Sequence, residues 1–186
     1  QAQSPYSASK IGADKIAESF FRSFEMPVVI ARPFNAYGPR QSARAIIPTI
    51  ITQLLSGNED IRLGSLHPTR DFNYVRDICN GLILLSKFDE AIGKEVNIGS
   101  NTEISIGTLA DMLIKLLNAK VKIVTEDLRK RPDKSEVERL ACDNSLIKEI
   151  TSWEPETLLK DGLLETIEWF NSEENMKRYK GDIYNI

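Results

Sequence analysis

The 186-residue sequence is poor in the residues that several kinds of functional site require. It contains one histidine, His67, and two cysteines, Cys79 and Cys142, which stand far apart in the chain. A metal site with several histidines is therefore excluded, and neither a disulfide framework nor a cysteine-rich metal site is expected. A Ser-His-Asp triad could use only His67. Two isolated cysteines fit a reducing compartment, so we expect a cytoplasmic protein.

The sequence also lacks the features of membrane and nucleic-acid-binding proteins. Its apolar runs, such as residues 82–85, are far too short to span a bilayer. Basic and acidic residues nearly balance, with 24 against 27, so nothing attracts the chain to polyanions in general. We therefore expect neither a membrane nor a nucleic acid as a partner.

Glycines are present, but they are not grouped. None of the ten glycines forms a Gly-x-Gly or Gly-x-x-Gly pair. A nucleotide-binding α/β domain usually begins with a strand and a glycine-rich turn that holds the pyrophosphate on backbone N–H groups. That cradle is absent from this sequence. The chain also opens without a methionine and enters a helix at once, which we interpret as a piece of a longer protein.

What is present is an alternation of strand and helix patterns, which predicts an α/β fold. Apolar residues at helical spacing predict helices from Ser4-Pro5 onward and at residues 46–55, 75–85, 106–116, 145–150 and 158–170. Short apolar runs predict strands at residues 28–31, 61–63, 95–98 and 121–124, the first of them buried and parallel. We expect the polar segment from residue 171 to be loosely held.

The first predicted helix carries two features of interest. Phe20, Phe21 and Phe24 form an apolar stripe that we expect to pack as ordinary core rather than to bind a ligand. Tyr6 and Lys10 stand four residues apart and share a helix face. A Lys ammonium beside a Tyr hydroxyl favours the phenolate, which can act as a general base. The alternative for this pair is a solvated face without a chemical role.

Two later segments offer candidate binding residues. The turn-rich exit of the first strand contains Pro33, Asn35 and Arg40, and ligands of open α/β sheets bind at the carboxyl ends of strands. A plain strand-to-helix loop is the alternative there. Arg70 heads a strand-and-helix unit, where its planar fork of donors could meet a phosphate. Its alternative is a surface ion pair with a neighbouring aspartate, Asp71 or Asp77.

Five stretches, taken in order, resemble the C-terminal half of extended short-chain dehydrogenase/reductases, the NAD-dependent epimerase/dehydratase family. They are residues 6–10 (YSASK), 31–41 (ARPFNAYGPRQ), 70–77 (RDFNYVRD), 97–100 (NIGS) and 131–137 (RPDKSEV). The last stretch, with Trp153-Glu154-Pro155, is most similar to nucleotide-sugar 4,6-dehydratases of the legionaminic-acid type. Those enzymes start from an N-acetylglucosamine nucleotide. Nucleotide-sugar 4-epimerases are the alternative.

The resemblance implies a divided fold. Residues 1–43 and 70–99 would be the remnant of a Rossmann-type parallel sheet with its catalytic helix. Residues 44–69 and 100–171 would form the smaller α/β substrate-binding lobe, followed by a tail at 172–186. The glycine-rich N-terminal half, a third catalytic hydroxyl and an acidic pair that eliminates water belong to the part of the family's fold upstream of the Tyr. The missing half would be a partner of this chain.

On the cofactor side, the resemblance implies that Tyr6 is the base that takes the proton of a sugar hydroxyl. Lys10 would bind the nicotinamide ribose of NAD and favour the Tyr6 phenolate, and Pro33 would lie near the nicotinamide. The implied reaction passes hydride from sugar C4 to NAD, loses water across C5 and C6, and returns the hydride to C6.

On the substrate side, the resemblance implies that Asn35, Arg70 and Arg131 hold the diphosphate of a nucleotide sugar. Arg40 is a further substrate-binding candidate, and Glu136 would reach the nucleotide ribose.

These patterns support three hypotheses about the chain. The complete protein would be an NAD-dependent dehydratase or epimerase, and a homodimer. The isolated chain would be inactive and would not hold NAD. It would instead bind a nucleotide weakly, or associate with itself through the apolar stripe of its first helix, whose sheet neighbours would be missing.

Overall fold

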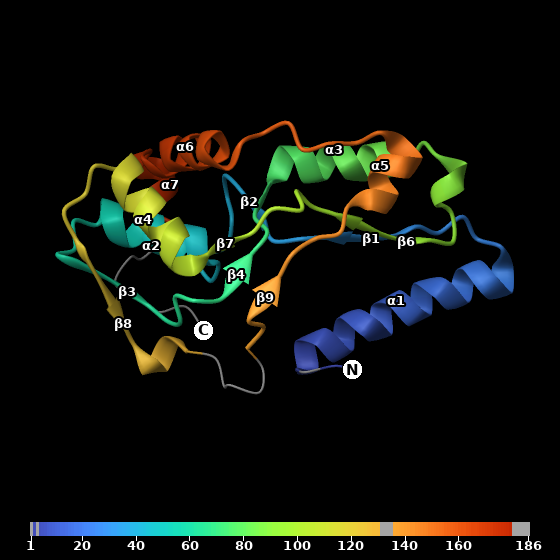
Figure 1. Cartoon of the computed structure of the whole chain (residues 1–186), viewed down its shortest axis with the longest axis horizontal. Coiled ribbons are helices and arrows are strands. Elements are labelled where there is room, and N and C mark those ends of the chain that lie inside the picture. The colour runs from blue at the N-terminus through green and yellow to red at the C-terminus, as the bar shows by residue number, and fades with distance from the viewer. Residues whose placement is uncertain (1, 3, 131–135, 180–186) are drawn as a thin grey trace.

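The computed structural model describes residues 2, 4–130 and 136–179. Its first element, helix α1 (Pro5–Phe24), lies along one side of the molecule in Figure 1. The helix begins at Ser4, whose hydroxyl accepts a hydrogen bond from the Ser7 N–H at 3.1 Å. The Ser7 hydroxyl in turn accepts from the Ser4 N–H at 2.9 Å, which completes a capping box. The predicted N-terminus of this helix is therefore confirmed.

A two-stranded parallel sheet lies between α1 and two other helices. Strand β1 (Ile30–Pro33) pairs with β6 (Glu95–Ile98), and helices α3 (Val75–Leu85) and α5 (Ser145–Thr151) cover the face away from α1 (Figure 1). The core on that face is formed by Ile78, Leu85, Ala91, Val96, Ile98, Ile147 and Trp153. The parallel pairing was predicted correctly, but β1 starts two residues later than the apolar run.

The expectation that β1 is fully buried is wrong. Its residues Ile30 and Ala31 are half-buried, and Arg32 and Pro33 are exposed. The reason is that α1, the element on the other face, buries none of its own 20 residues and shields the sheet incompletely. The expectation that the phenylalanine stripe forms ordinary core is wrong for the same reason, because Phe20 and Phe24 are exposed.

The second region is built around three helices, α2 (Ile46–Leu55), α4 (Ile106–Leu116) and α6 (Leu159–Phe170). Ser105 caps α4, because its hydroxyl accepts from the Thr108 N–H at 3.0 Å. Strands β3 (Asp60–Leu63) and β8 (Lys122–Thr125) pair in parallel beside these helices. The fully buried side chains here include Ile50, Ile51, Ile61, Leu109, Leu113, Leu163 and Phe170.

The chain after α6 is held against this second core as far as Tyr179. Helix α7 (Glu173–Met176) is short, and the Tyr179 ring packs on Phe170 with the ring centroids 4.8 Å apart. The Tyr179 hydroxyl also donates to the backbone carbonyl of Gln41 at 3.0 Å. The expectation of a loosely held tail is therefore wrong up to Tyr179.

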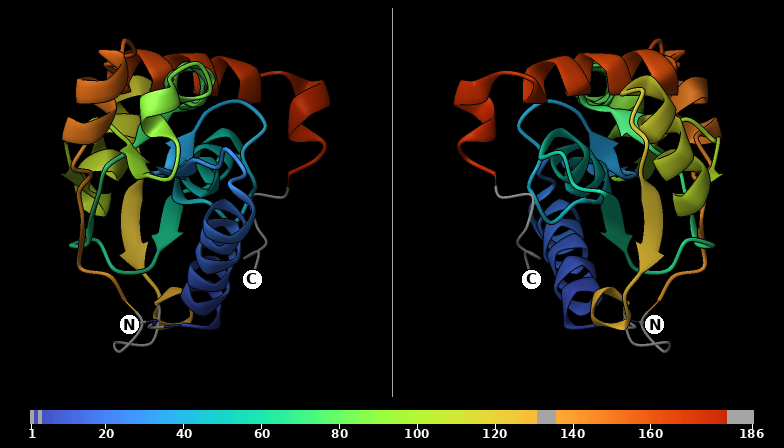
Figure 2. Two further views of the ribbon diagram at one scale, coloured as in Figure 1. Left: turned by 90° about the vertical axis from the view of Figure 1, so that its right-hand side faces the viewer. Right: turned by 90° about the vertical axis from the view of Figure 1, so that its left-hand side faces the viewer.

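Short strands join the two regions at the middle of the molecule (Figure 1), and in the end-on views of Figure 2 the two regions lie one behind the other. Strand β2 (Ala36–Tyr37) pairs in parallel with β5 (Asn73–Tyr74). Strand β4 (Thr69–Arg70) lies between β7 (Ile104–Ser105) and β9 (Arg139–Leu140). Two single turns, η1 (Asp89–Ala91) and η2 (Asp127–Arg129), complete the described elements. Within the described part of the chain, no helix is both long enough and apolar enough to cross a membrane.

Candidate substrate and catalytic site

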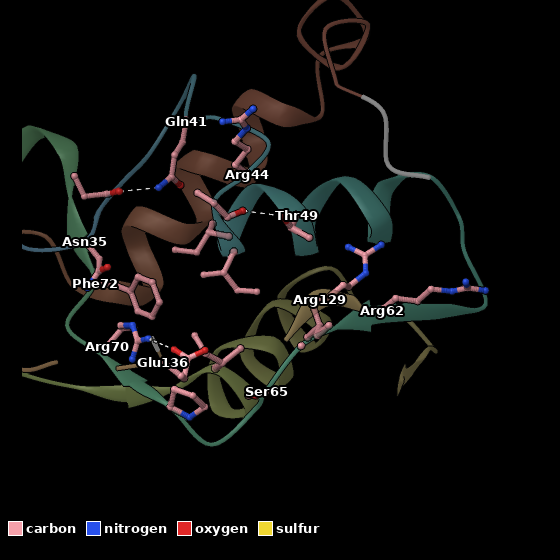
Figure 3. Close-up of a pocket in the computed structure, with 18 residues that line it drawn as sticks. Asn35, Gln41, Arg44, Thr49, Arg62, Ser65, Arg70, Phe72, Arg129 and Glu136 are labelled. Atoms are coloured by element: carbon pink, nitrogen blue, oxygen red, sulfur yellow. Dashed lines mark hydrogen bonds and ion pairs between the residues drawn. The ribbon is translucent and has the colours of Figure 1, made fainter. Parts of the chain in front are cut away.

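A pocket of about 390 Å³ lies where the short strands that join the two regions meet α2 and β3 (Figure 3). Three residues predicted to bind substrate, Asn35, Arg70 and Glu136, line it together. They come from segments that are far apart in the sequence, so the fold itself brings them into one place. The remaining wall is formed by Ala36, Gln41, Arg44, Ala45, Ile46, Ile47, Thr49, Arg62, Leu63, Gly64, Ser65, Pro68, Phe72, Ile106 and Arg129.

Arg70 and Glu136 form an ion pair inside this pocket. Arg70 Nη2 lies 2.9 Å from Glu136 Oε1, and each side chain is only 13% exposed. Arg70 Nη1 also donates to the carbonyl of Thr69 at 2.8 Å. The two charges thus orient each other at the wall of a polar pocket. The alternative interpretation of Arg70 as a surface partner of Asp71 or Asp77 is wrong, because its carboxylate partner is Glu136.

Asn35 reaches the pocket through the pairing of β2 with β5. Its backbone carbonyl accepts from the Asn73 N–H at 3.0 Å. Its side-chain Nδ2 donates to the backbone carbonyl of Asp71 at 3.3 Å. These bonds fix the side chain beside Arg70, at the carboxyl end of β1. This is the location at which open α/β sheets bind ligands.

Sequence reasoning missed three further arginines of the pocket, Arg44, Arg62 and Arg129. Arg62 Nη1 donates to Glu126 at 3.1 Å, and Arg129 Nε donates to the same carboxylate at 2.7 Å. The hydrogen bond from Arg129 holds the pKa of Glu126 below its ordinary value. The alternation of side chains along β3 could have predicted that Arg62 points away from the core. Its neighbours Ile61 and Leu63 are apolar, which points the arginine to the other face.

Tyr6 and Lys10 share a face of α1, as predicted, but they do not line the pocket. The Lys10 Nζ lies 5.6 Å from the centroid of the Tyr6 ring, and the Tyr6 side chain is 71% exposed. Asp14 is four residues further along the same face, and Arg32 Nε of β1 donates to its carboxylate at 3.1 Å. A second arm of Arg32 reaches Glu95 of β6 at 2.9 Å. This ion-pair bridge ties α1 to the sheet through Asp14 and leaves Tyr6 and Lys10 exposed.

Two other predicted site residues, Pro33 and Arg40, do not line the pocket. Pro33 ends β1 opposite Ile98 and is exposed. Arg40 is also exposed and has a left-handed backbone with φ of 67°. Arg131 lies outside the described residues. Among residues 2, 4–130 and 136–179, no group of three or more His, Cys, Asp and Glu side chains could hold a metal ion.

Comparison with known proteins decides the family. The family model described as GDP-mannose 4,6 dehydratase matches residues 1–166. The chain belongs to the GDP-mannose 4,6 dehydratase family. This confirms the resemblance to extended short-chain dehydrogenase/reductases that the ordered motifs carried.

Individual members and structures agree with this placement. A dTDP-glucose 4,6-dehydratase of Actinoplanes is 33% identical over 91% of this chain and 52% of its own length. An epimerase of Methanothermobacter thermautotrophicus superposes with a TM-score of 0.87 at 27% identity, over 96% of this chain and 53% of that one. A dTDP-glucose 4,6-dehydratase of Bacillus anthracis, solved in complex with NAD, gives a TM-score of 0.80 at 30% identity. That match covers 92% of this chain and 53% of the other.

The chain therefore spans about half the length of the GDP-mannose 4,6 dehydratase family relatives that it matches. The predicted α/β fold with parallel strands is confirmed by these structures. Asn35, Arg70 and Glu136 together line one pocket and form the candidate site.

Proposed function

We propose that the complete protein carrying these residues is an NAD-dependent nucleotide-sugar 4,6-dehydratase, and that the pocket binds the substrate diphosphate. The observation that carries this proposal is the meeting of Asn35, Arg70 and Glu136 in one polar pocket. The dTDP-glucose 4,6-dehydratases among the relatives support the reaction class. The sequence motifs favour an N-acetylglucosamine nucleotide as the sugar substrate.

The diphosphate would lie against Arg70 and Asn35. Arg70 offers a charged, planar donor group, and Asn35 offers an amide N–H₂ at the same wall. A charge-assisted hydrogen bond of this kind contributes about 1.5–3 kcal/mol to binding. Glu136 holds the guanidinium in place and leaves a carboxylate at the pocket, where the nucleotide ribose is proposed to bind. Arg131 is proposed as a second phosphate ligand on the basis of its motif.

The chemistry would take place at the exposed end of α1. The Tyr6 hydroxyl is proposed to take the proton of the sugar hydroxyl, with the Lys10 ammonium stabilising the phenolate that remains. NAD, when bound, supplies the hydride acceptor. Tyr6, Lys10 and Pro33 are exposed, and we propose that they would contact its nicotinamide end. The sequence contains no glycine-rich turn for the pyrophosphate, so this chain fits only one end of the cofactor.

A nucleotide-sugar 4-epimerase is the second candidate. The similarity to the methanogen epimerase favours it, because that fold superposes at least as well as the dehydratase folds do. Tyr6, Lys10 and the diphosphate pocket would serve both reactions. The two reactions diverge after the first hydride transfer, since only the dehydratase eliminates water.

Product analysis separates the two candidates. The complete protein is incubated with NAD and a panel of nucleotide sugars, including UDP-N-acetylglucosamine and dTDP-glucose, and the products are identified by NMR. A 4-keto-6-deoxy sugar establishes the dehydratase, and a C4-inverted sugar establishes the epimerase. Unchanged sugars across the whole panel would contradict both.

The role of the pocket is tested by binding alone. Nucleoside diphosphates are titrated into the wild-type chain and into Arg70→Ala, which we expect to bind about 10- to 100-fold more weakly. Arg76→Ala is a matched control, because Arg76 is an exposed arginine outside the pocket, paired with Glu165. Equal affinities for wild type and Arg70→Ala would remove Arg70 from the proposed site.

A further inference from the structure

Asp71 is a fully buried carboxylate at the centre of the junction between the two regions of the chain. Its Oδ1 accepts from Asn73 Nδ2 at 3.0 Å, from the Ser100 N–H at 3.2 Å and from the Ser100 hydroxyl at 2.7 Å. Its Oδ2 accepts from the N–H groups of Asn101 at 2.9 Å and Cys142 at 3.2 Å. Five donors from three separate segments therefore converge on one side chain.

The backbone of Asp71 extends the same network toward the pocket. Its N–H donates to the Leu140 carbonyl at 3.0 Å, and its carbonyl accepts from Asn35 Nδ2 at 3.3 Å. The bond to Leu140 and the bond from the Cys142 N–H together hold the end of β9 against the end of β4. Glu136 precedes β9 by three residues, and Arg70 is the chain neighbour of Asp71. The network thus includes Asn35, adjoins Arg70 in the chain, and holds the strand that follows Glu136.

The packing around this carboxylate is tight. A Cβ added at Gly99 would lie 2.6 Å from the Cβ of Cys142 and 3.2 Å from Asp71 Oδ2. A carboxylate only accepts hydrogen bonds, which matches the five donors around it. An amide at position 71 would direct its own N–H₂ group at one set of these donors. In such close packing, the surrounding segments would have to move apart.

We infer that Asp71 is a positioning residue for the diphosphate pocket: its buried carboxylate holds the segments that follow β6 and β9 beside β5, its backbone carbonyl holds Asn35, and together these bonds set the positions of Asn35 and the Arg70–Glu136 pair. This inference rests on the proposed function of the pocket. Asp71 does not itself line the pocket and would not touch the ligand. Its effect would pass through the residues that do.

Asp71→Asn tests the inference, with Asp77→Asn as the matched control. Asp77 is also a buried aspartate, and it accepts from the Thr157 N–H at 3.0 Å and from the Thr157 hydroxyl at 3.2 Å. It anchors the segment before α6 and does not line the pocket. Both variants should therefore lose thermal stability, but only Asp71→Asn should disturb the pocket. Ser100→Ala is a milder second variant, because it removes one donor and keeps the carboxylate.

Two measurements are made on each chain at a temperature where circular dichroism shows it folded. Titration with UDP, dTDP and GDP should show about tenfold or more weaker binding for Asp71→Asn, a smaller loss for Ser100→Ala, and affinity within about twofold of wild type for Asp77→Asn. The NMR signals of the Arg70 guanidinium, assigned with Arg70→Lys, report on the Glu136 pair without any ligand. They should change in Asp71→Asn and stay unchanged in Asp77→Asn.

The outcomes distinguish the inference from the function on which it rests. If Asp71→Asn and Ser100→Ala both keep the Arg70 signals of the wild type, Asp71 is structural only and the inference is overturned. If the wild-type chain binds none of the three diphosphates, the proposed function of the pocket fails, while the guanidinium signals still decide the role of Asp71. An equal loss of affinity in Asp71→Asn and Asp77→Asn would also overturn the inference, because general destabilisation would then explain both.

Discussion

Helix α1 and the helices of the second region contrast in how they are held. α1 has 20 residues, none of them buried, and it is anchored by ion pairs such as Arg32 with Asp14. In the second region, helices α2, α4 and α6 together bury a continuous apolar core. Burial of apolar surface supplies most of the stability of a fold, whereas exposed ion pairs supply little. We therefore expect α1, which carries the residues proposed for the chemistry, to contribute much less to the stability of the fold than α2, α4 and α6 do.

The largest expected effect is on turnover, and it comes from α1. Tyr6→Phe in the complete protein removes one hydroxyl from an exposed side chain and should slow the reaction by about 10²–10⁴-fold. Because the ring makes no buried contact, the melting temperature of the chain should stay unchanged. Steady-state kinetics and thermal unfolding of the same preparation measure both quantities.

Lys10→Met extends this test. It should slow the reaction, because the phenolate loses the ammonium group beside it. Near-normal turnover in Tyr6→Phe would show that α1 does not carry the general base.

The next effect is on stability, and it comes from the second region. Leu109 of α4 is fully buried, so Leu109→Ala should lower the free energy of unfolding by about 2–5 kcal/mol. Ile16 of α1 is 63% exposed, and Ile16→Ala should cost about 0.5 kcal/mol or less. Urea unfolding of the two variants compares the regions directly. Equal losses would mean that α1 is part of the cooperative core.

The amino-acid sequence predicts the helices of both regions well, for a physical reason. Their apolar residues recur at helical spacing, and local caps such as Ser4 and Ser105 fix where helices begin. The two-residue strands at the junction could not be predicted, because β4 and β9 are formed by pairing between distant segments rather than by local pattern. The buried state of the phenylalanine stripe was mispredicted, since periodicity shows an apolar face but not what covers it.

The candidate site was predicted in part. Residues in local motifs were identified, whereas contacts between distant segments were not. Asn35, Arg70 and Glu136 were found because they stand in recognisable motifs, and the fold then brings them together. The partnership of Arg70 with Glu136 was missed, because the two are 66 residues apart and nothing local indicates it. Asp71 was interpreted only as a possible surface partner of Arg70. Its network depends on three segments meeting, which no single stretch of sequence contains.

A smaller effect is expected on association. Phe20 and Phe24 of α1 are 42% and 71% exposed and lie with their ring centroids 5.6 Å apart. We predict that this apolar pair lets the 186-residue chain associate with a second copy, and that Phe24→Glu weakens the association about tenfold. Leu158→Glu is the control, because Leu158 is equally exposed but lies in the second region. Light scattering over a concentration series measures the association. A strictly monomeric wild-type chain at high concentration would contradict the prediction.

The smallest expected signal is the binding of NAD. The chain of residues 1–186 should not bind NAD with micromolar or tighter affinity. Tight binding in this fold depends on a glycine-rich turn whose N–H groups hold the pyrophosphate, and this sequence has none. α1 offers only Tyr6 and Lys10, both on an exposed face, for the nicotinamide end. Hydrogen bonds that remain open to water contribute little to net affinity, so the two side chains alone cannot hold the cofactor. Isothermal titration with NAD should therefore give no saturable heat. The same chain titrated with a nucleoside diphosphate should give saturable heat, because Asn35, Arg70 and Glu136 line one pocket of this chain. Micromolar binding of NAD would show that the cofactor contacts residues other than those of α1. It would then contradict the assignment of the cofactor contacts in this chain to a few exposed side chains.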